Sequence, residues 1–259
     1  MPIEIAPTKR AAYGAGDIPL ALVRPRAVFA RVEDVPAYAW SLMILLTCFA
    51  LLGWALVETG LIDREVDRGV QERIAAFDKL QVDVVERSAI TKNIAEARQE
   101  GEFLKLMSRV QAIAFEPIAG LATVLLLPAA FYGLVALTGK KPEWHTLIAI
   151  AVYASFVDVL AGTTQLGFML GMGTLDVDTS AGALTRSMVA VTQADATRIA
   201  ALSGALSALD PFRVWFWWIL LTGLTATSQL RGWKAWAVCV GFWLAAAGVR
   251  TALGVAAVS

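Results

Sequence analysis

The chain has 259 residues, of which 58% are hydrophobic and only 17% are charged. Ordinary soluble domains carry about 25% charged residues, so this composition indicates a membrane protein. The formal net charge is zero, which gives no sign of a nucleic-acid partner, and one histidine with two cysteines is too few ligands to suggest a metal site. We therefore expect an all-α integral membrane protein with no metal, no cofactor and no nucleic acid bound.

Residues 1–36 are polar, basic and spaced by prolines, and we expect them to form a cytoplasmic N-terminal segment. Within this segment, Ile18–Val35 is predicted to form a short amphipathic helix on the membrane surface, interrupted at Pro25. The first transmembrane span is predicted at residues 37–57, where the chain is apolar for about the length that a bilayer core requires.

Hydropathy then falls sharply, and residues 61–111 form a charged insert without proline. Apolar residues recur there at three- and four-residue steps, which is typical of an amphipathic helix. This first stripe, which we predict to bind a partner, consists of Val66, Val70, Ile74, Phe77 and Val84. A looser second stripe follows at Ile90, Ile94, Phe103 and Met107. We expect a helical hairpin, or one long broken helix, outside the bilayer; its apolar side would be covered by the following loop, a second copy or another protein.

Residues 112–259 are predicted to be a membrane domain with four further spans, which makes five in total. Asp210 is a good N-cap, and Pro211 occupies the first helical position, where its missing N–H costs nothing. We expect two short helices near the membrane surface at residues 171–210. The four spans are expected at about 112–138, 145–170, 211–229 and 233–255.

Orientation is inferred from the two shortest loops, which carry Lys140, Lys141, Arg231 and Lys234. With a cytoplasmic N-terminus, nine Lys and Arg would lie inside and eleven outside, so the raw count does not favour that orientation. Short basic loops near the spans, however, carry most of the orientation signal. We therefore expect a multi-pass protein of the cell (inner) membrane with a cytoplasmic N-terminus, an extracytoplasmic C-terminus and an extracytoplasmic insert.

Ionisable and polar residues inside the predicted spans are candidate functional groups, because burying a charge in a bilayer is costly. They form a predicted polar cluster made up of Glu116, Asp158, Gln165, Arg213 and Arg250. Asp158 and Arg250 reach similar depths in spans that run in the same direction, so they are able to pair. The cluster either gates or binds something, or it is an ion-pair network that holds the helices together.

Catalytic motifs are missing from the sequence: it has no phosphate-binding lysine loop, nucleophile elbow, HExxH pair or glycine-rich dinucleotide loop. No nucleophile and base are visible as a set. We therefore expect no catalytic residues and no enzyme activity.

Four segments resemble the Yip domain family, whose members span the membrane five times and are named for Ypt/Rab GTPase interaction. LSALDPFRVWFWWI (Leu206–Ile219) is similar to the family's entry into span four, and QLRGWKAWAV (Gln229–Val238) fits its basic hairpin. RPRAVFARVEDVP (Arg24–Pro36) is similar to its lead into span one, and AVYASFVDVL (Ala151–Leu160) to its third span. The resemblance covers nearly the whole chain except the insert. It implies a cytoplasmic N-terminus and no catalytic residues.

The charged insert resembles the bacterial branch of that family, some members of which are similar to accessory subunits of macrolide-exporter-type ABC transporters. The leading hypothesis is a non-catalytic scaffold or accessory subunit of a membrane complex, such as an ABC-type transporter, embedded in the lipid bilayer with a membrane-protein partner or a second copy. The alternative is a small transporter or lipid-handling protein with a polar pathway near Asp158 and Arg250. A third hypothesis is binding of a vesicle-type GTPase.

Overall fold

The computed structural model describes residues 14–78, 84–175, 206 and 209–256, and within these ranges the regular elements are all helical. The chain divides into two compact units. The first comprises Met1–Leu46, Gly120–Gly162 and Asp178–Ser259, and the second comprises Thr47–Ala119 and Thr163–Val177.

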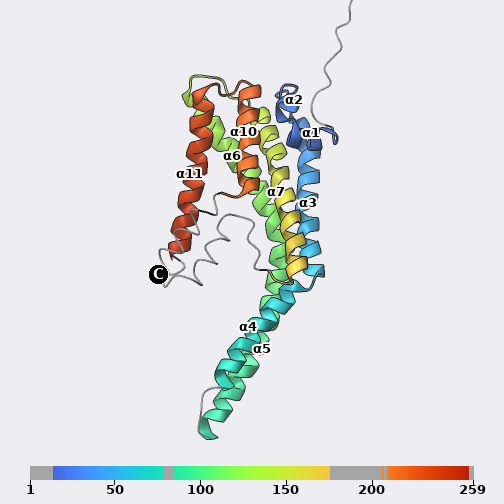
Figure 1. Ribbon diagram of the computed structural model, residues 1–259, viewed down its shortest axis with the longest axis vertical. Helices are drawn as coiled ribbons and strands as arrows, with labels where there is room; N and C mark the ends of the chain where they lie inside the picture. The colour runs from blue at the N-terminus through green and yellow to red at the C-terminus, as the bar shows by residue number, and fades with distance from the viewer. Residues whose placement is uncertain (1–13, 79–83, 176–205, 207–208, 257–259) are drawn as a thin grey trace, which may run out of the picture. The chain divides into compact units, whose positions relative to one another are not determined.

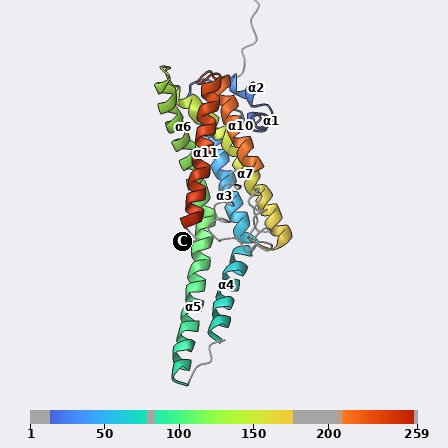
Figure 2. The ribbon, with the colours of Figure 1, turned by 60° about the vertical axis from the view of Figure 1, so that its left-hand side comes forward.

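The helices are shown in Figure 1 and, turned, in Figure 2. In chain order they are α1 (Asp17–Val23), α2 (Pro25–Phe29), η1 (Pro36–Tyr38), α3 (Ala39–Glu58), α4 (Leu61–Asp78), α5 (Val84–Val110), η2 (Gln111–Phe115), α6 (Glu116–Leu137), α7 (Trp144–Met172), α10 (Pro211–Ala226) and α11 (Trp233–Ala256).

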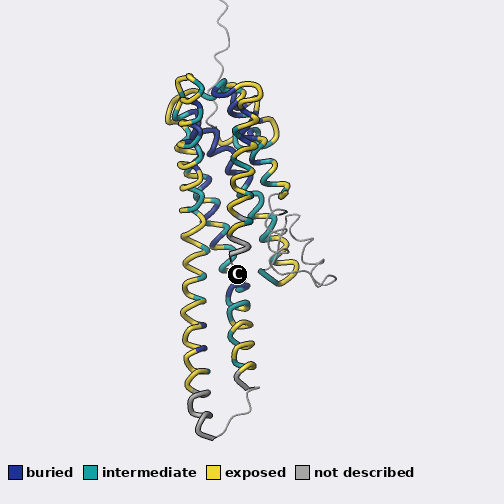
Figure 3. Tube along the Cα trace, turned by 90° about the vertical axis from the view of Figure 1, so that its left-hand side faces the viewer, coloured by how far each residue is buried: buried dark blue, intermediate teal, exposed yellow. Residues whose placement is uncertain are grey.

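The core of the first unit is built around α7. Twelve consecutive residues, from Thr146 to Val157, are buried, so this part of the helix is enclosed by protein on every side (Figure 3). Helix α10 packs closely against it, because a Cβ on Gly223 would lie 2.6 Å from the Ile150 Cγ2 atom. The missing side chain at Gly223 is therefore what allows the two helices to approach.

The N-terminal helices α1 and α2 belong to this core. Helix α1 ends at Val23 and α2 begins at Pro25, which confirms the predicted interruption, since proline fits the first helical position but not a helix interior. Phe29 is buried edge-on against Tyr153, with ring centroids 6.2 Å apart. An ion pair of 2.7 Å joins Arg31, which follows α2, to Asp17 at the start of α1.

The start of α10 also matches its prediction. Asp210 has extended backbone angles, and its carboxylate accepts a hydrogen bond of 2.8 Å from the Phe212 N–H, with Pro211 at the first helical position. The cap satisfies one of the N–H groups that a helix start leaves unpaired.

In the second unit, α4 and α5 run side by side in opposite directions (Figures 1 and 2). Gly101 of α5 is buried against Val70 of α4, whose Cγ2 atom would lie 2.7 Å from an added Cβ. Salt bridges on both sides of this contact join the two helices. The pair is thus held by a close backbone approach and by charges.

In the part of the chain that the structure describes, three helical stretches are long and apolar enough to cross a membrane: Pro36–Glu58, Lys92–Leu137 and Trp144–Met172. The first and third coincide with predicted spans. The second is longer than predicted, because α5, η2 and α6 follow one another without a break, and a single π-helical turn stands at the predicted boundary between insert and span. Pro117 lacks the N–H that the Ile113 carbonyl would accept in an α-helix, which accounts for an irregular turn there.

The predicted short helices at 171–210 lie mostly outside the described residues, and α7 continues to Met172. Helix α10 has 16 residues, and the apolar part of α11, Trp233–Val249, is shorter than the three long stretches.

Candidate functional site

Within the first unit, α7 and α10 bring two members of the predicted polar cluster together. An Nη atom of Arg213 lies 3.3 Å from the Asp158 Oδ1 atom, and the two groups form an ion pair and a hydrogen bond. Asp158 comes directly after the buried stretch of α7, and Arg213 lies in the first turn of α10, whose start is set by the Asp210 cap. The side chains remain 24% and 41% exposed, so this pair lies at the border of the core.

The other members of that cluster have different positions. Glu116, the exposed first residue of α6, and Gln165 of α7 both belong to the second unit. Arg250 lies on α11, but its side chain is outside the described residues. The pairing of Asp158 with Arg250 therefore stays a prediction, and Arg213 is one partner of Asp158 in the structure.

A second polar arrangement in the first unit, which we call the three-loop junction, joins the segment before α3 to the turns before α7 and α11. Its members are Asp34, Lys140, Glu143, Ser228 and Gln229. The Asp34 carboxylate accepts hydrogen bonds of 2.9 and 3.2 Å from the backbone N–H groups of His145 and Thr146. A carboxylate at this point satisfies unpaired donors of α7 and complements its dipole.

The same junction ties the two short turns to each other. Gln229 is buried; its amide oxygen accepts from the Glu143 N–H at 3.2 Å, and its amide nitrogen donates to the Glu143 carboxylate at 2.8 Å. The Lys140 ammonium donates to the Ser228 carbonyl at 2.7 Å. The junction was not predicted from the sequence, where these basic turns indicated only orientation; Gln229, a polar residue between two apolar segments, is the signal that could have pointed to it.

In the second unit, charges are paired along the contact of α4 with α5. Arg109 is paired with Asp63, and this hydrogen bond holds the pKa of the Asp63 carboxyl below its ordinary value. Lys105 lies between two carboxylates, at 2.7 Å from Asp67 and 2.9 Å from Glu102. The positive charges of Lys105 and Arg109 are thus compensated by carboxylates of the same two helices.

The predicted partner-binding stripe lies on α4. Val66, Val70 and Ile74 are half-buried, and Val70 faces Gly101 of α5, while the side chains of Phe77 and Val84 are outside the described residues. Large apolar side chains remain exposed on α5: Phe103 is 60% exposed, Leu104 44%, Leu106 55%, Met107 44% and Val110 50%. All of these except Leu104 recur at three- and four-residue steps, and we call those four the α5 row. Two of them, Phe103 and Met107, belong to the stripes noted in the sequence.

Among the described residues, no three His, Cys, Asp or Glu side chains gather closely enough to hold a metal ion.

Long apolar helices, an enclosed central helix and a polar junction between short turns define a multi-pass helical membrane protein. The Yip1 domain matches residues 20–253, so the chain belongs to the Yip1 domain family. Comparison with curated proteins gave no match, and comparison with solved structures gave none either. Membership of this family is consistent with a non-catalytic membrane protein.

Proposed function

We propose that this protein is a non-catalytic scaffold or accessory subunit of a membrane complex, in which the α4–α5 pair binds another membrane protein. The observation that carries this proposal is the α5 row. The four apolar side chains of the row are exposed beside charges that are already paired within the unit. A contiguous exposed apolar surface marks a contact with protein or with a membrane, and because the proposed topology places the α4–α5 pair outside the bilayer, we infer a protein contact.

The chemistry of the helix pair favours an apolar contact over an electrostatic one. Arg109 and Lys105 lie next to the row in sequence, but their charges are compensated by Asp63, Asp67 and Glu102. A helix that presents residues at i, i+3, i+4 and i+7 offers the pattern by which amphipathic helices bind an apolar groove. The partner class that we favour is an ABC-type transporter subunit, and the competing occupant is a second copy of this chain.

The proposed topology has five spans, a cytoplasmic N-terminus, an extracytoplasmic C-terminus and an extracytoplasmic α4–α5 pair in the inner membrane. The three-loop junction supports it. The N-terminal segment and the turns before α7 and α11 would all be cytoplasmic in this topology, and Asp34, Glu143 and Gln229 connect them by hydrogen bonds. Segments that bond directly to one another must lie on the same side of a bilayer.

The experiment is purification of the full chain in mild detergent from its native membrane, followed by mass spectrometry of the co-eluting proteins. We expect a membrane protein at a fixed ratio in the wild type and its loss in the triple variant Phe103→Ser, Leu106→Ser, Val110→Ser. The matched control is Gln99→Ala, Arg98→Ala, which changes exposed residues of the same helix. A wild-type chain that elutes alone as a monomer, or a triple variant that retains its partner, would exclude the proposal; a homo-oligomer would replace the transporter by a second copy.

The alternative function, a small transporter or lipid-handling protein with a polar pathway near Asp158 and Arg250, is favoured by one observation. The Asp158–Arg213 pair is partly exposed instead of sealed inside the core. In that case a cysteine placed at position 158 would react with a water-soluble maleimide in intact membranes, whereas a purely structural ion pair would be protected from the reagent.

A further inference from the structure

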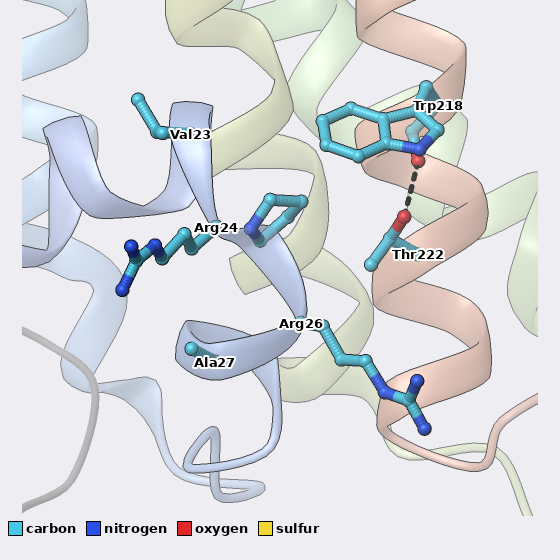
Figure 4. Close-up of a pocket in the computed structure, with 7 residues that line it drawn as sticks. Val23, Arg24, Arg26, Ala27, Trp218 and Thr222 are labelled. Carbon is cyan, nitrogen blue, oxygen red and sulfur yellow. Dashed lines mark hydrogen bonds between the residues drawn. The ribbon is translucent and has the colours of Figure 1, made fainter.

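A groove opens in the first unit where α1 gives way to α2, beside the middle of α10 (Figure 4). It has a volume of about 580 Å³, and its lining residues are Val23, Arg24, Pro25, Arg26, Ala27, Trp218 and Thr222. The indole N–H of Trp215 donates to the Leu22 carbonyl at 3.1 Å and so anchors α1 to α10 next to the groove. The groove is therefore a fixed feature of the packed helices.

The walls of the groove are mostly apolar and face outward. Val23 is 72% exposed and Trp218 is 46% exposed, and Val214, one turn before Trp218 on α10, is exposed as well. In a membrane protein, an exposed apolar helix face of this kind lies against lipid. The only polar side chain that α10 contributes is Thr222, and its hydroxyl is already bonded to the Trp218 carbonyl at 2.8 Å.

Two arginines belong to the lining, and Figure 4 shows the Arg26 guanidinium beside α10, whereas the Arg24 guanidinium points away from α10. Arg24 and Arg26 are exposed and form no ion pair with any residue that the structure describes, whereas Arg31, a few residues later, is engaged by Asp17. A guanidinium group beside an apolar groove is suited to a phosphate group, which it binds through two parallel hydrogen bonds.

The order of the side chains along α10 indicates how a ligand in the groove would be oriented. In Figure 4, Trp218, Thr222 and the guanidinium of Arg26 follow one another along α10 toward its C-terminal end. That end leads into the turn with Ser228 and Gln229, which belongs to the three-loop junction. The apolar part of the groove thus lies toward the middle of the helix, and the positive charge lies toward the membrane surface.

We propose that this groove binds an anionic phospholipid, with one acyl chain along Trp218 and Pro25 and the phosphate on Arg26. Amphipathic ligands of this class combine the apolar length and the negative charge that the groove complements, and basic sites between membrane helices are known to suit acidic headgroups. The site does not depend on the identity of any protein partner. It uses residues of the first unit alone.

The test is native mass spectrometry of the purified full chain after addition of phosphatidylglycerol or phosphatidylcholine. We expect the wild type to retain phosphatidylglycerol in preference to phosphatidylcholine. Arg26→Gln should weaken phosphatidylglycerol binding by about fivefold, since one basic residue at a membrane surface contributes about 1 kcal/mol. Arg24→Gln, whose side chain points away from α10, should weaken it less. The control, Arg231→Gln, Lys234→Gln, removes two exposed basic residues outside the groove and should keep the preference.

A second pair of variants tests the apolar part of the groove without changing charge. Thr222→Trp fills the groove and should abolish retention of both lipids, whereas Thr225→Trp, on the same helix and outside the groove, should leave it intact. Both threonines are bonded to backbone carbonyls of α10, so the two substitutions lose comparable hydrogen bonds. Equal binding of the two lipids by the wild type, or undiminished phosphatidylglycerol binding by Arg26→Gln, would overturn the proposal. Indistinguishable effects of the two tryptophan variants would do the same.

Discussion

Gln229 and Glu143 exchange two hydrogen bonds across turns that are 86 residues apart in the chain. The Gln229 amide accepts from the backbone of Glu143 and donates to its carboxylate, and the same carboxylate oxygen accepts from the Thr146 hydroxyl at 3.0 Å. Because Gln229 is buried, each of its polar atoms depends on this exchange. The relationship fixes the turn before α11 to the start of α7.

Replacing Gln229 by alanine should therefore destabilise the first unit. The variant leaves a backbone N–H and a carboxylate without their partner, and we expect a loss of about 1–3 kcal/mol in the free energy of unfolding. Thermal unfolding in detergent, followed by circular dichroism, measures it. Gln99→Ala, at an exposed position of α5, is the control and should change stability by less than about 0.5 kcal/mol. Equal melting temperatures for the two variants would contradict the prediction.

The Asp158–Arg213 pair predicts energetic coupling between the two positions. Asp158→Asn and Arg213→Gln should each destabilise the chain, because each leaves one charge without its partner, while the double variant should lose less than the sum of the two. We expect a coupling energy of about 0.5–3 kcal/mol from the double-mutant cycle. The same cycle with Arg250→Gln tests the predicted pairing of Asp158 with Arg250. Additive losses in a cycle would exclude that pair.

Because of the Asp63–Arg109 pair, we expect the stability of the chain to depend on pH in the acidic range. The hydrogen bond from Arg109 lowers the pKa of Asp63 in the folded chain, so the pair stabilises the α4–α5 contact above the unfolded pKa of about 4 and is lost as pH falls below that value. Between pH 6 and pH 3, the melting temperature of the wild type should therefore fall further than that of Asp63→Asn. Parallel pH profiles for the two proteins would show that the pair does not contribute.

The approach of α4 to α5 depends on the absence of a side chain at position 101. In Gly101→Leu the new side chain meets Val70, and we expect a cost of about 1–3 kcal/mol from overpacking, read as a lower melting temperature of the purified chain. Gly69→Ala is the matched control, since nothing lies within 4 Å of an added Cβ there. That change should stabilise α4 by about 0.5–1 kcal/mol, because alanine is a better helix former. A destabilised Gly69→Ala would mean that α4 does not tolerate substitutions in general.

Features that depend on neighbouring residues in the chain were predictable. The Asp210 cap and the break at Pro25 follow from local rules of helix starts, and the first and third membrane helices follow from apolar length. The extent of the second was not predicted, because α5 continues through a π-helical turn into α6 and does not stop before Pro117. A proline in the sequence does not show whether the helix stops there or continues through an irregular turn.

Contacts between segments that are distant in the chain were harder to predict from the sequence. Hydropathy and spacing showed that Asp158 needs a partner, but Arg213 and Arg250 were both eligible, and periodicity does not say which helices are neighbours. The three-loop junction was missed for the same reason: Asp34 looks like an ordinary loop carboxylate until its oxygen meets the first N–H groups of α7. The packing of the helices determines which residues pair, and a single sequence does not show how the helices pack.

The enclosure of Thr146–Val157 changes what limits variation in the central helix. The stretch that contains α7 has a mean hydropathy of 1.8, lower than the 2.1 of the other two long stretches. Because this stretch does not touch lipid, its residues need not be apolar throughout. A hydroxyl is tolerated where a backbone carbonyl of the helix accepts its hydrogen bond, as at Ser155, which donates to the Ala151 carbonyl. Volume is the constraint instead: Ala154 should tolerate serine better than leucine, the reverse of the preference expected on a face that touches acyl chains.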